Sequence, residues 1–280
     1  MIEKTPEKQN EMRVGIVQMC STENIEENLN TMIRLGRKAA GQGAQWILYP
    51  ENCLWLSADS NKMAPTLYPE SGPLSQLKAM AKEVNAWLLL GSVAEESPEQ
   101  DRVFNTSVLI SPLGDVQAHY RKCFLFDVDI TGRETHQESS RVAPGKELVT
   151  SQVAGQTTGL SICYDLRFPE MYRELTRKGA TILTVPAAFT STTGRDHWEV
   201  LLRARAIENQ CFVVAPNQWG HHGGKRRSYG RSLVVSPWGV ILAQVSDGEG
   251  IAVTSLNIDE LRKIRRQLPC LSHTRPELFN

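Results

Sequence analysis

Two stretches of the chain resemble each other and limit what it can fold into: residues 107–118, SVLISPLGDVQA, and residues 232–243, SLVVSPWGVILA. In each, Ser-Pro-x-Gly separates two segments with alternating apolar residues. Proline presets one backbone angle of a tight turn and glycine tolerates a positive φ, so each stretch is predicted to form a β-hairpin. Similar hairpins far apart in the chain indicate a protein with two related halves.

Short apolar runs and amphipathic segments alternate along the rest of the chain. The runs are predicted strands, and the segments, whose apolar residues recur at helical spacing, are predicted helices. Asn24 and Glu27 are placed to cap the first helix. This order favours an α/β fold with mixed sheets covered by helices, and two similar halves could stack two such sheets face to face. The predicted strands are residues 13–20, 44–52, 87–94, 159–163, 180–186 and 211–217, and the predicted helices are residues 23–43, 74–84, 169–179 and 196–210.

Length and composition favour a single domain. With 280 residues, of which 41% are hydrophobic and 22% charged, the chain can bury an ordinary core. We expect a polar N-terminal arm at residues 1–12, one domain at residues 13–269 and a C-terminal tail at residues 270–280. The polar start lacks the apolar core of a signal peptide, and no apolar run approaches the roughly 20 residues that span a bilayer. A cytoplasmic protein without membrane contact is therefore expected.

Charge and cysteine spacing argue against several classes of function. Lys and Arg number 31 and Asp and Glu number 31, so no excess positive charge is available to neutralise nucleic-acid phosphates. The six cysteines form no Cys-x-x-Cys pair and have no histidine at zinc-ligand spacing, so neither a metal site nor a disulfide framework is expected. Most of these thiols are expected to be small buried side chains in a reducing compartment.

Three chemically reactive residues each stand just past a predicted strand: Glu51 after WILYP, Lys122 after VQAHYR and Cys163 after GLSI. Functional sites of α/β proteins gather where strands end. Taken singly, a charged residue after a strand is most often in a solvated loop, and a cysteine there is most often part of the core. Taken together, they favour a catalytic site in which the three side chains meet.

The chemistry of a cysteine nucleophile explains why these three residue types belong together. A thiol near its free pKa is mostly protonated at neutral pH and needs a base or a positive charge to become a thiolate. Glu51 is the candidate base, and the charge of Lys122 favours the thiolate and, later, an oxyanion. A helix predicted to begin near Pro169 would direct its N-terminal N–H groups toward the thiol.

Histidine, the obvious competitor for the role of base, has a weaker context. None of the six histidines follows a strand as clearly as Glu51, and the sequence around Cys163 is unlike that of papain-type proteases. His221 and His222 lie in the stretch HHGGKRR, which is expected to be a solvated, mobile loop. Whether residues 220–228 act as a lid over the site is left open.

The segments LYPEN around Glu51, YRKCFLFD around Lys122 and ICYDLRFPE around Cys163 occur in an order that resembles the carbon-nitrogen hydrolase (nitrilase) superfamily over nearly the whole chain. The resemblance implies an α-β-β-α four-layer sandwich of two mixed sheets flanked by helices, paired with a second chain into a homodimer or higher homo-oligomer. It implies a Glu-Lys-Cys catalytic set that cleaves a linear amide through a cysteine thioester, with no cofactor and no metal. We expect the backbone N–H of Tyr164 to help bind the oxyanion. A second glutamate of the family is matched by Glu138 in QESSRVAPG.

Three further segments, residues 193–218, 225–239 and 265–279, look like the Nit branch of this superfamily. Its best-matching members hydrolyse deaminated glutathione, so the expected reaction is hydrolysis of a primary amide of that compound to acid and ammonia. Two alternatives stay open: an ω-amidase that acts on 2-oxoglutaramate or another small carboxylate-bearing amide, and a Nit-type scaffold with a partner-binding role. An amidotransferase domain is disfavoured because one hydrolase domain fills the chain.

Substrates of this kind carry carboxylates, so a pocket arginine is expected to bind one of them in bidentate fashion. Arg167 and Arg195 are the candidates. The alternatives are a structural ion pair between Arg167 and a neighbouring carboxylate, and simple exposure of Arg195. Phe189 and Thr190, just past the predicted strand 180–186, are expected pocket walls because sites gather at strand ends.

Overall fold

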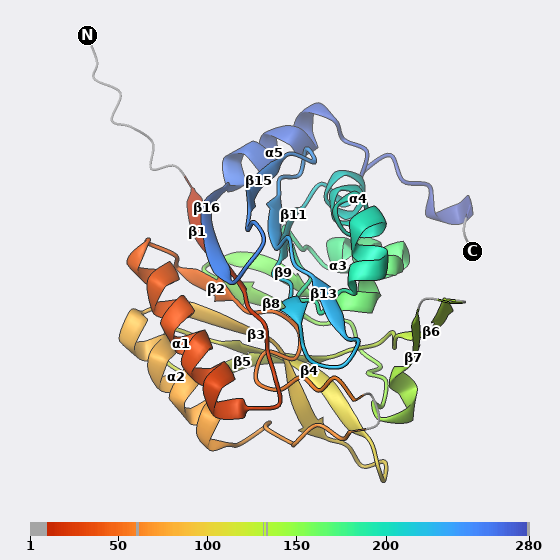
Figure 1. Ribbon diagram of the computed structural model, residues 1–280. Helices are drawn as coiled ribbons and strands as arrows, with labels where there is room; N and C mark the ends of the chain where they lie inside the picture. The colour runs from red at the N-terminus through yellow and green to blue at the C-terminus, as the bar shows by residue number, and fades with distance from the viewer. Residues whose placement is uncertain (1–9, 60–61, 131, 133, 279–280) are drawn as a thin grey trace.

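The body of the protein consists of two six-stranded sheets stacked between helices (Figure 1). The structure, a computed structural model, describes residues 10–59, 62–130, 132 and 134–278. The first sheet has the order β16 (Gly250–Asn257), β1 (Glu11–Gln18), β2 (Trp46–Leu48), β3 (Trp87–Glu96), β4 (Val103–Ile110), β5 (Val116–Arg121). The second has the order β15 (Ile241–Gln244), β14 (Leu233–Val235), β11 (Phe212–Ala215), β10 (Ile182–Thr184), β9 (Gln156–Leu160), β8 (Thr150–Val153).

Four helices cover the outer faces of the sheets. Helices α1 (Ile25–Gly41) and α2 (Gly72–Val84) lie side by side on the first sheet, and α3 (Pro169–Arg177) and α4 (Ser191–Asn209) lie on the second (Figure 1). The layers therefore run helix, sheet, sheet, helix, which confirms the predicted four-layer sandwich. Helix α5 (Ile258–Gln267) follows the last strand.

Shorter elements connect these layers. Two small hairpins stand apart from the main sheets, one formed by β6 and β7 and the other by β12 and β13. Three single turns of 3-10 helix complete the described structure. The bounds are β6 (Asp127–Ile130), β7 (Glu134–Gln137), β12 (Trp219–His221), β13 (Arg227–Tyr229), η1 (Glu138–Ser140), η2 (Cys163–Arg167) and η3 (Pro276–Leu278).

Side chains on the two faces of the first sheet belong to two different hydrophobic clusters. Leu88 and Leu90 of β3 pack in a cluster with residues of α1 and α2, whereas Leu89 belongs to the cluster that contains residues of the second sheet. Successive side chains of a strand point to opposite faces, so a strand that is covered on both sides is apolar at every position. This is why the sequence shows continuous apolar runs rather than alternating ones.

The two Ser-Pro-x-Gly hairpins form as predicted and occupy matching edges of the two sheets. In the β4–β5 turn the N–H of Gly114 donates to the carbonyl of Ser111 at 2.8 Å, and in the β14–β15 turn the N–H of Gly239 donates to that of Ser236 at 2.8 Å. Beyond each hairpin come one antiparallel strand pair, two parallel pairs and a final antiparallel pair. The two sheets therefore repeat one pattern, which confirms the two related halves.

Element boundaries differ from prediction in a few places. Residues 1–9 of the expected arm lie outside the described residues, and β1 begins at Glu11, inside that arm. Helix α4 begins at Ser191, ahead of the expected start at residue 196. The Asn24 side chain accepts a hydrogen bond from the N–H of Glu27 at 3.2 Å, as the predicted cap requires. No described helix has the length and apolar character to cross a membrane.

Cysteine burial is less complete than expected. The six thiols are free; Cys53, Cys163 and Cys211 are buried, whereas Cys20 and Cys123 are half-buried. The remaining thiol, Cys270 in the C-terminal tail, is exposed.

Candidate active site

Glu51, Lys122 and Cys163 line one cavity. Glu51 follows β2 and Lys122 follows β5, both in the first sheet, whereas Cys163 follows β9 of the second sheet and begins η2. The cavity therefore receives side chains from the strand ends of both sheets. The three residues are only 3%, 2% and 9% exposed.

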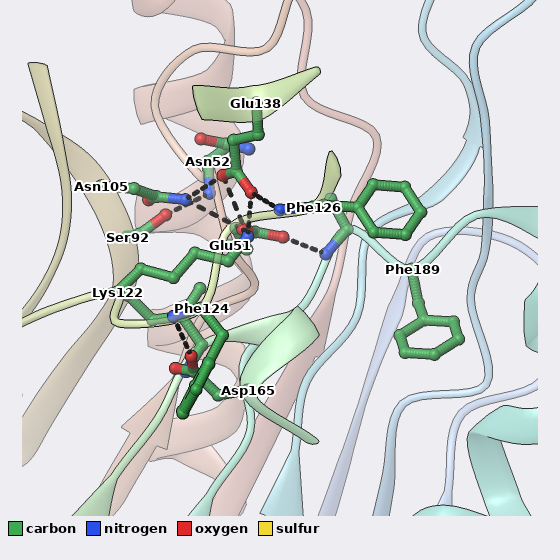
Figure 2. A network of polar contacts seen from close by, with 12 residues as sticks. Glu51, Asn52, Ser92, Asn105, Lys122, Phe124, Phe126, Glu138, Asp165 and Phe189 are labelled. Atoms are coloured by element: carbon green, nitrogen blue, oxygen red, sulfur yellow. Dashed lines mark hydrogen bonds and ion pairs between the residues drawn. The ribbon is translucent and has the colours of Figure 1, made fainter. Parts of the chain in front are cut away.

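The Glu51 carboxylate is held by groups from both sheets. Its Oε1 accepts hydrogen bonds from Lys122 Nζ and Asn105 Nδ2, each at 2.9 Å, and its Oε2 accepts one from the backbone N–H of Ala188 at 2.8 Å (Figure 2). Burial alone would raise the pKa of Glu51, but the charge of Lys122 and these hydrogen bonds outweigh it and bring the pKa below its usual value. Glu51 is therefore ionised at neutral pH and able to accept a proton.

Lys122 is bound by two carboxylates. Its Nζ donates to Glu51 and also to Oε1 and Oε2 of Glu138, at 3.0 and 2.9 Å. The N–H of Phe126 donates to Glu138 Oε2 at 2.7 Å and fixes that carboxylate (Figure 2). Burial alone would lower the pKa of Lys122, but the charges of Glu138 and Glu51 raise it well above its usual value. Lys122 therefore stays an ammonium in a buried site.

Cys163 sits in a turn that is unfavourable for a side chain. Its φ of 47° lies in the left-handed region, and its backbone N–H donates to the carbonyl of Pro186 at 2.9 Å. Burial raises the pKa of the Cys163 thiol well above its usual value; the charge of Glu51 raises it further and that of Lys122 opposes the rise. The resting group is a thiol, so a base has to remove its proton when it reacts.

Contrary to expectation, the helix that begins at Pro169 does not directly follow Cys163. Helix α3 begins at Pro169, as predicted, but the single turn η2 lies between it and the cysteine. The N–H groups that follow Cys163 in the chain therefore belong to η2 and not to α3. A five-residue turn aligns few peptide dipoles, so it favours a thiolate less than the expected longer helix would.

A close approach of two segments positions Glu51. A Cβ atom at Gly91 in β3 would lie 2.2 Å from the carbonyl oxygen of Tyr49 and 2.3 Å from that of Pro50, so only glycine fits. The N–H of Asn52 donates to Ser92 Oγ at 2.8 Å (Figure 2). The turn that carries Glu51 is thus fixed against the neighbouring strand.

Asp165 joins the cysteine turn to the lysine loop. Its carboxylate accepts a hydrogen bond from the N–H of Phe124 at 3.0 Å (Figure 2). It also accepts from the N–H of Ile162 at 2.8 Å and from the hydroxyl of Tyr120 at 2.7 Å. Burial raises the pKa of Asp165 to about 6, although these hydrogen bonds oppose the rise. The segments on either side of Lys122 and Cys163 are therefore held by one buried side chain.

The expected pocket walls Phe189 and Thr190 line the cavity, together with Tyr164 and Arg167. The Arg167 guanidinium lies 5.7 Å from the ring centre of Tyr164 and 5.2 Å from that of Phe189. Arg195 is exposed on α4 and is not among the residues that line the cavity. The structure therefore favours Arg167 over Arg195 as a residue that meets substrate.

The stretch HHGGKRR corrects a sequence expectation. It is the turn of the β12–β13 hairpin, and only His221 of its two histidines is exposed. His222 is buried, with Nδ1 2.9 Å from the carbonyl of Ser21 and Nε2 2.9 Å from Ser228 Oγ. A carbonyl only accepts, so Nδ1 carries the proton and Nε2 accepts from the serine. Burial lowers the pKa of His222 to about 4, and the neutral ring fastens the hairpin beside the cavity.

A family model described as carbon-nitrogen hydrolase matches residues 13–266. The chain belongs to the carbon-nitrogen hydrolase family. Among curated relatives of this hydrolase, the deaminated glutathione amidase of Bos taurus is 42% identical over 272 residues, which cover 95% of this chain and 83% of the bovine one. The deaminated glutathione amidase of Synechocystis sp. is 41% identical over 260 residues, or 92% of this chain and 96% of its own. The solved structure of the C. elegans NitFhit protein matches with a TM-score of 0.91 at 34% identity, over 96% of this chain and 66% of that one.

Three residues of this carbon-nitrogen hydrolase site escaped the sequence reasoning. Asn105 donates to Glu51 and also, at 3.4 Å, to Glu138 Oε1; an amide inside the apolar run VFNTSVLI was its only signal. Asp165 was signalled by its place two residues after the cysteine. Arg226 lines the cavity from the β12–β13 turn, and nothing in the sequence distinguished it from its neighbours. Within the part of the chain that the structure describes, no cluster of three His, Cys, Asp or Glu side chains could hold a metal ion.

Proposed function

We propose that this carbon-nitrogen hydrolase is an amidase that cleaves deaminated glutathione through a thioester on Cys163. The observation that carries the proposal is the position of the Glu51 carboxylate, bonded to Lys122 at 2.9 Å and to the Ala188 N–H at 2.8 Å in the cavity that Cys163 lines. The relatives named deaminated glutathione amidase, at 41% and 42% identity over most of the chain, support the substrate.

The structure of that substrate changes the expected products. Replacing the amino group of γ-glutamyl-cysteinylglycine by a keto group gives 2-oxoglutaryl-cysteinylglycine, in which both amides are secondary. The expected release of ammonia from a primary amide therefore does not apply to this compound. Hydrolysis of the amide next to the 2-oxoglutaryl group yields 2-oxoglutarate and cysteinylglycine, so the leaving group is a primary amine.

In the first half of the proposed reaction, Glu51 takes the thiol proton while the sulfur of Cys163 bonds to the amide carbon. The negative oxygen that results is stabilised by the Lys122 ammonium and the backbone N–H of Tyr164. The carbon–nitrogen bond then breaks, and Glu51 returns the proton to the departing nitrogen. An acyl thioester remains on Cys163.

In the second half, Glu51 takes a proton from water, whose oxygen attacks the thioester carbon. The carbon–sulfur bond breaks, the acid leaves and the thiol regains its proton. Glu138 touches neither the sulfur nor the water in this scheme; it holds Lys122 in place through both of its oxygens. Its role is positioning.

A homo-oligomer is part of the proposal, and exposed apolar side chains support it. Val200 and Ile207 on α4 and Trp238 and Val240 in the β14–β15 turn are 66%, 49%, 61% and 52% exposed. The sulfur and its base lie within one chain, so the chemistry itself requires no second copy. Size-exclusion chromatography with light scattering would give the number of chains in the particle. A monomer would contradict the proposed homo-oligomer.

The test is a direct comparison of substrates. The protein is incubated separately with 2-oxoglutaryl-cysteinylglycine, 2-oxoglutaramate and a β-ureido acid, and the acid, amine and ammonia released are quantified. The highest kcat/KM is expected for the first compound. Preference for 2-oxoglutaramate would make the protein an ω-amidase, and no turnover of any compound by a folded protein would favour the scaffold alternative.

A further inference from the structure

A cation other than Lys122 faces the cavity. Arg226 lines it together with Glu51, Lys122 and Cys163. Its Nη1 donates to the backbone carbonyl of Ser57 at 2.8 Å, and among the residues that the structure describes it forms no ion pair. The guanidinium has five N–H donors, so most of them are left for another partner.

The β12–β13 hairpin holds Arg226 in this place. The Arg226 N–H donates to the carbonyl of Gly223 and its own carbonyl accepts from the N–H of His222, both at 3.1 Å. At the base of the hairpin the N–H of Tyr229 donates to the carbonyl of Phe189, a cavity wall, at 2.9 Å. Together with the anchored ring of His222, these contacts fix the backbone from which the guanidinium reaches the cavity.

Their contacts distinguish three other cations of the cavity from Arg226. Lys122 is matched by two carboxylates, Lys62 is paired with Glu23, and Arg167 stacks on aromatic rings. Burial lowers the pKa of Arg226, while attraction to Glu51 and Glu138 opposes this change; a guanidinium nevertheless stays protonated. Arg226 is half-buried and has no direct ion pair among the described residues, and a carboxylate that accepts two parallel N–H donors would compensate for its partial desolvation.

We propose that Arg226 binds a carboxylate of the substrate and makes the enzyme select anionic over neutral amides. The inference rests on the proposed amidase function and adds the residue that recognises the substrate. In 2-oxoglutaryl-cysteinylglycine the carboxylate can come from the acyl portion or from the terminal glycine. The chemistry that Arg226 recognises is the same in both cases.

The experiment measures KM and kcat for Arg226→Ala, Arg226→Lys and the matched control Arg227→Ala, whose side chain is exposed on the same hairpin. The substrates are 2-oxoglutaryl-cysteinylglycine, its glycinamide form, 2-oxoglutaramate and butyramide, which has no carboxylate. Arg226→Ala is expected to raise KM for the charged amides by about 10- to 100-fold, the size of a lost charged hydrogen bond, and to leave butyramide nearly unchanged. Arg226→Lys should recover part of the loss, and Arg227→Ala should behave like the original protein.

Comparing the four substrates distinguishes the possible outcomes. A loss that persists with the glycinamide form assigns Arg226 to the acyl carboxylate, and a loss that vanishes with it assigns Arg226 to the glycine carboxylate; both support the inference. The inference would be overturned if Arg226→Ala raised KM for butyramide as much as for the charged amides, or left KM unchanged for all of them. It would also be overturned if the selective loss appeared in Arg141→Ala instead, because Arg141 is another cation that lines the cavity. If the unsubstituted protein cleaves no amide at all, the proposed function fails first. Unfolding midpoints of all variants show whether the hairpin has stayed folded.

Discussion

Both oxygens of the Glu138 carboxylate lie within 3.0 Å of the Lys122 ammonium. Because Lys122 also bonds to Glu51, one positive charge is shared by two negative ones, and the three groups together carry a net negative charge. A thiolate beside them would add a second negative charge in a buried site. Burial and this charge balance together raise the pKa of the Cys163 thiol, so in the proposed reaction proton transfer to Glu51 accompanies attack.

The first prediction concerns the reactivity of the sulfur toward an alkylator. Because the pKa of Cys163 is raised, iodoacetamide should modify it slowly at neutral pH and faster as the pH rises. Glu138→Gln removes one negative charge, lets Lys122 act more strongly on the sulfur, and should speed modification at pH 7. Mass spectrometry of the Cys163 peptide measures the rate, with the exposed Cys270 as internal reference. Fast modification that does not vary between pH 6 and 8 would contradict the charge balance.

Replacing the sulfur tests the covalent intermediate. Cys163→Ala should release no acid and no amine, because no other described nucleophile takes its place in the scheme. Rapid quenching of the unsubstituted protein with substrate should yield a chain heavier by the acyl group, and the variant should show no such mass. Normal turnover by a pure, folded Cys163→Ala protein would falsify the thioester mechanism.

Glu51→Gln removes the proposed base while keeping the shape of the side chain. General base catalysis contributes about 10²- to 10⁴-fold, so kcat should fall by that factor. Glu26→Gln, an exposed residue in the first turn of α1, is the control. Circular dichroism should show both variants folded. A Glu51→Gln protein that retains more than half of its activity would leave another group as the base.

The different positions of Arg167 and Arg195 lead to a prediction about substrate binding. Arg167→Ala should raise KM, because its guanidinium lies over two rings that line the cavity, whereas Arg195→Ala should leave KM and kcat unchanged because that side chain is exposed. Steady-state kinetics with 2-oxoglutaryl-cysteinylglycine compares them directly. The reverse ranking would restore Arg195 as the substrate-facing residue.

His222 links stability to pH. Its pKa is about 4 in the folded chain, below its usual value of 6.5, so the unfolded chain binds more protons between these two values. The stabilising effect of the neutral ring is complete above pH 6.5 and is lost as the pH falls toward 4, by about 3 kcal/mol in total. His222→Gln should unfold at lower urea concentration at pH 7.5 but show a flatter pH dependence than the original protein. His221→Gln, at the exposed neighbouring position, should keep the original slope.

Local patterns could predict the hairpins and single out Glu51, Lys122 and Cys163 as reactive residues just past strands. The four-layer arrangement and the meeting of these three residues, of which Glu51 and Lys122 are 71 positions apart, were expected from the family resemblance. The sequence could not predict partners that are joined only by the folded chain. Asn105 meets Glu51 across 54 positions and His222 meets Ser21 across 201, so no local pattern encodes either contact.

The same reasoning explains the error over the stretch HHGGKRR. Its polar residues and glycines are typical of a solvated turn, and most of them are exposed. His222 is buried because the segment after β1, distant in sequence, supplies a carbonyl for its ring. Arg226 lines the cavity for the same reason: the direction of the hairpin is set by contacts at its base.

Cys163 follows a strand of the second sheet, whereas Glu51 and Lys122 follow strands of the first, so the site can be divided by cutting the chain once. A break in the segment between Glu138 and β8 would leave the acid and the ammonium on one fragment and the sulfur on the other. Neither fragment alone would be an enzyme. If mixing the two fragments restores activity, that activity measures reassociation of the sheets. If the fragments do not reassociate by themselves, each could be fused to one of two interacting proteins, and restored activity would then report that the two proteins are close together.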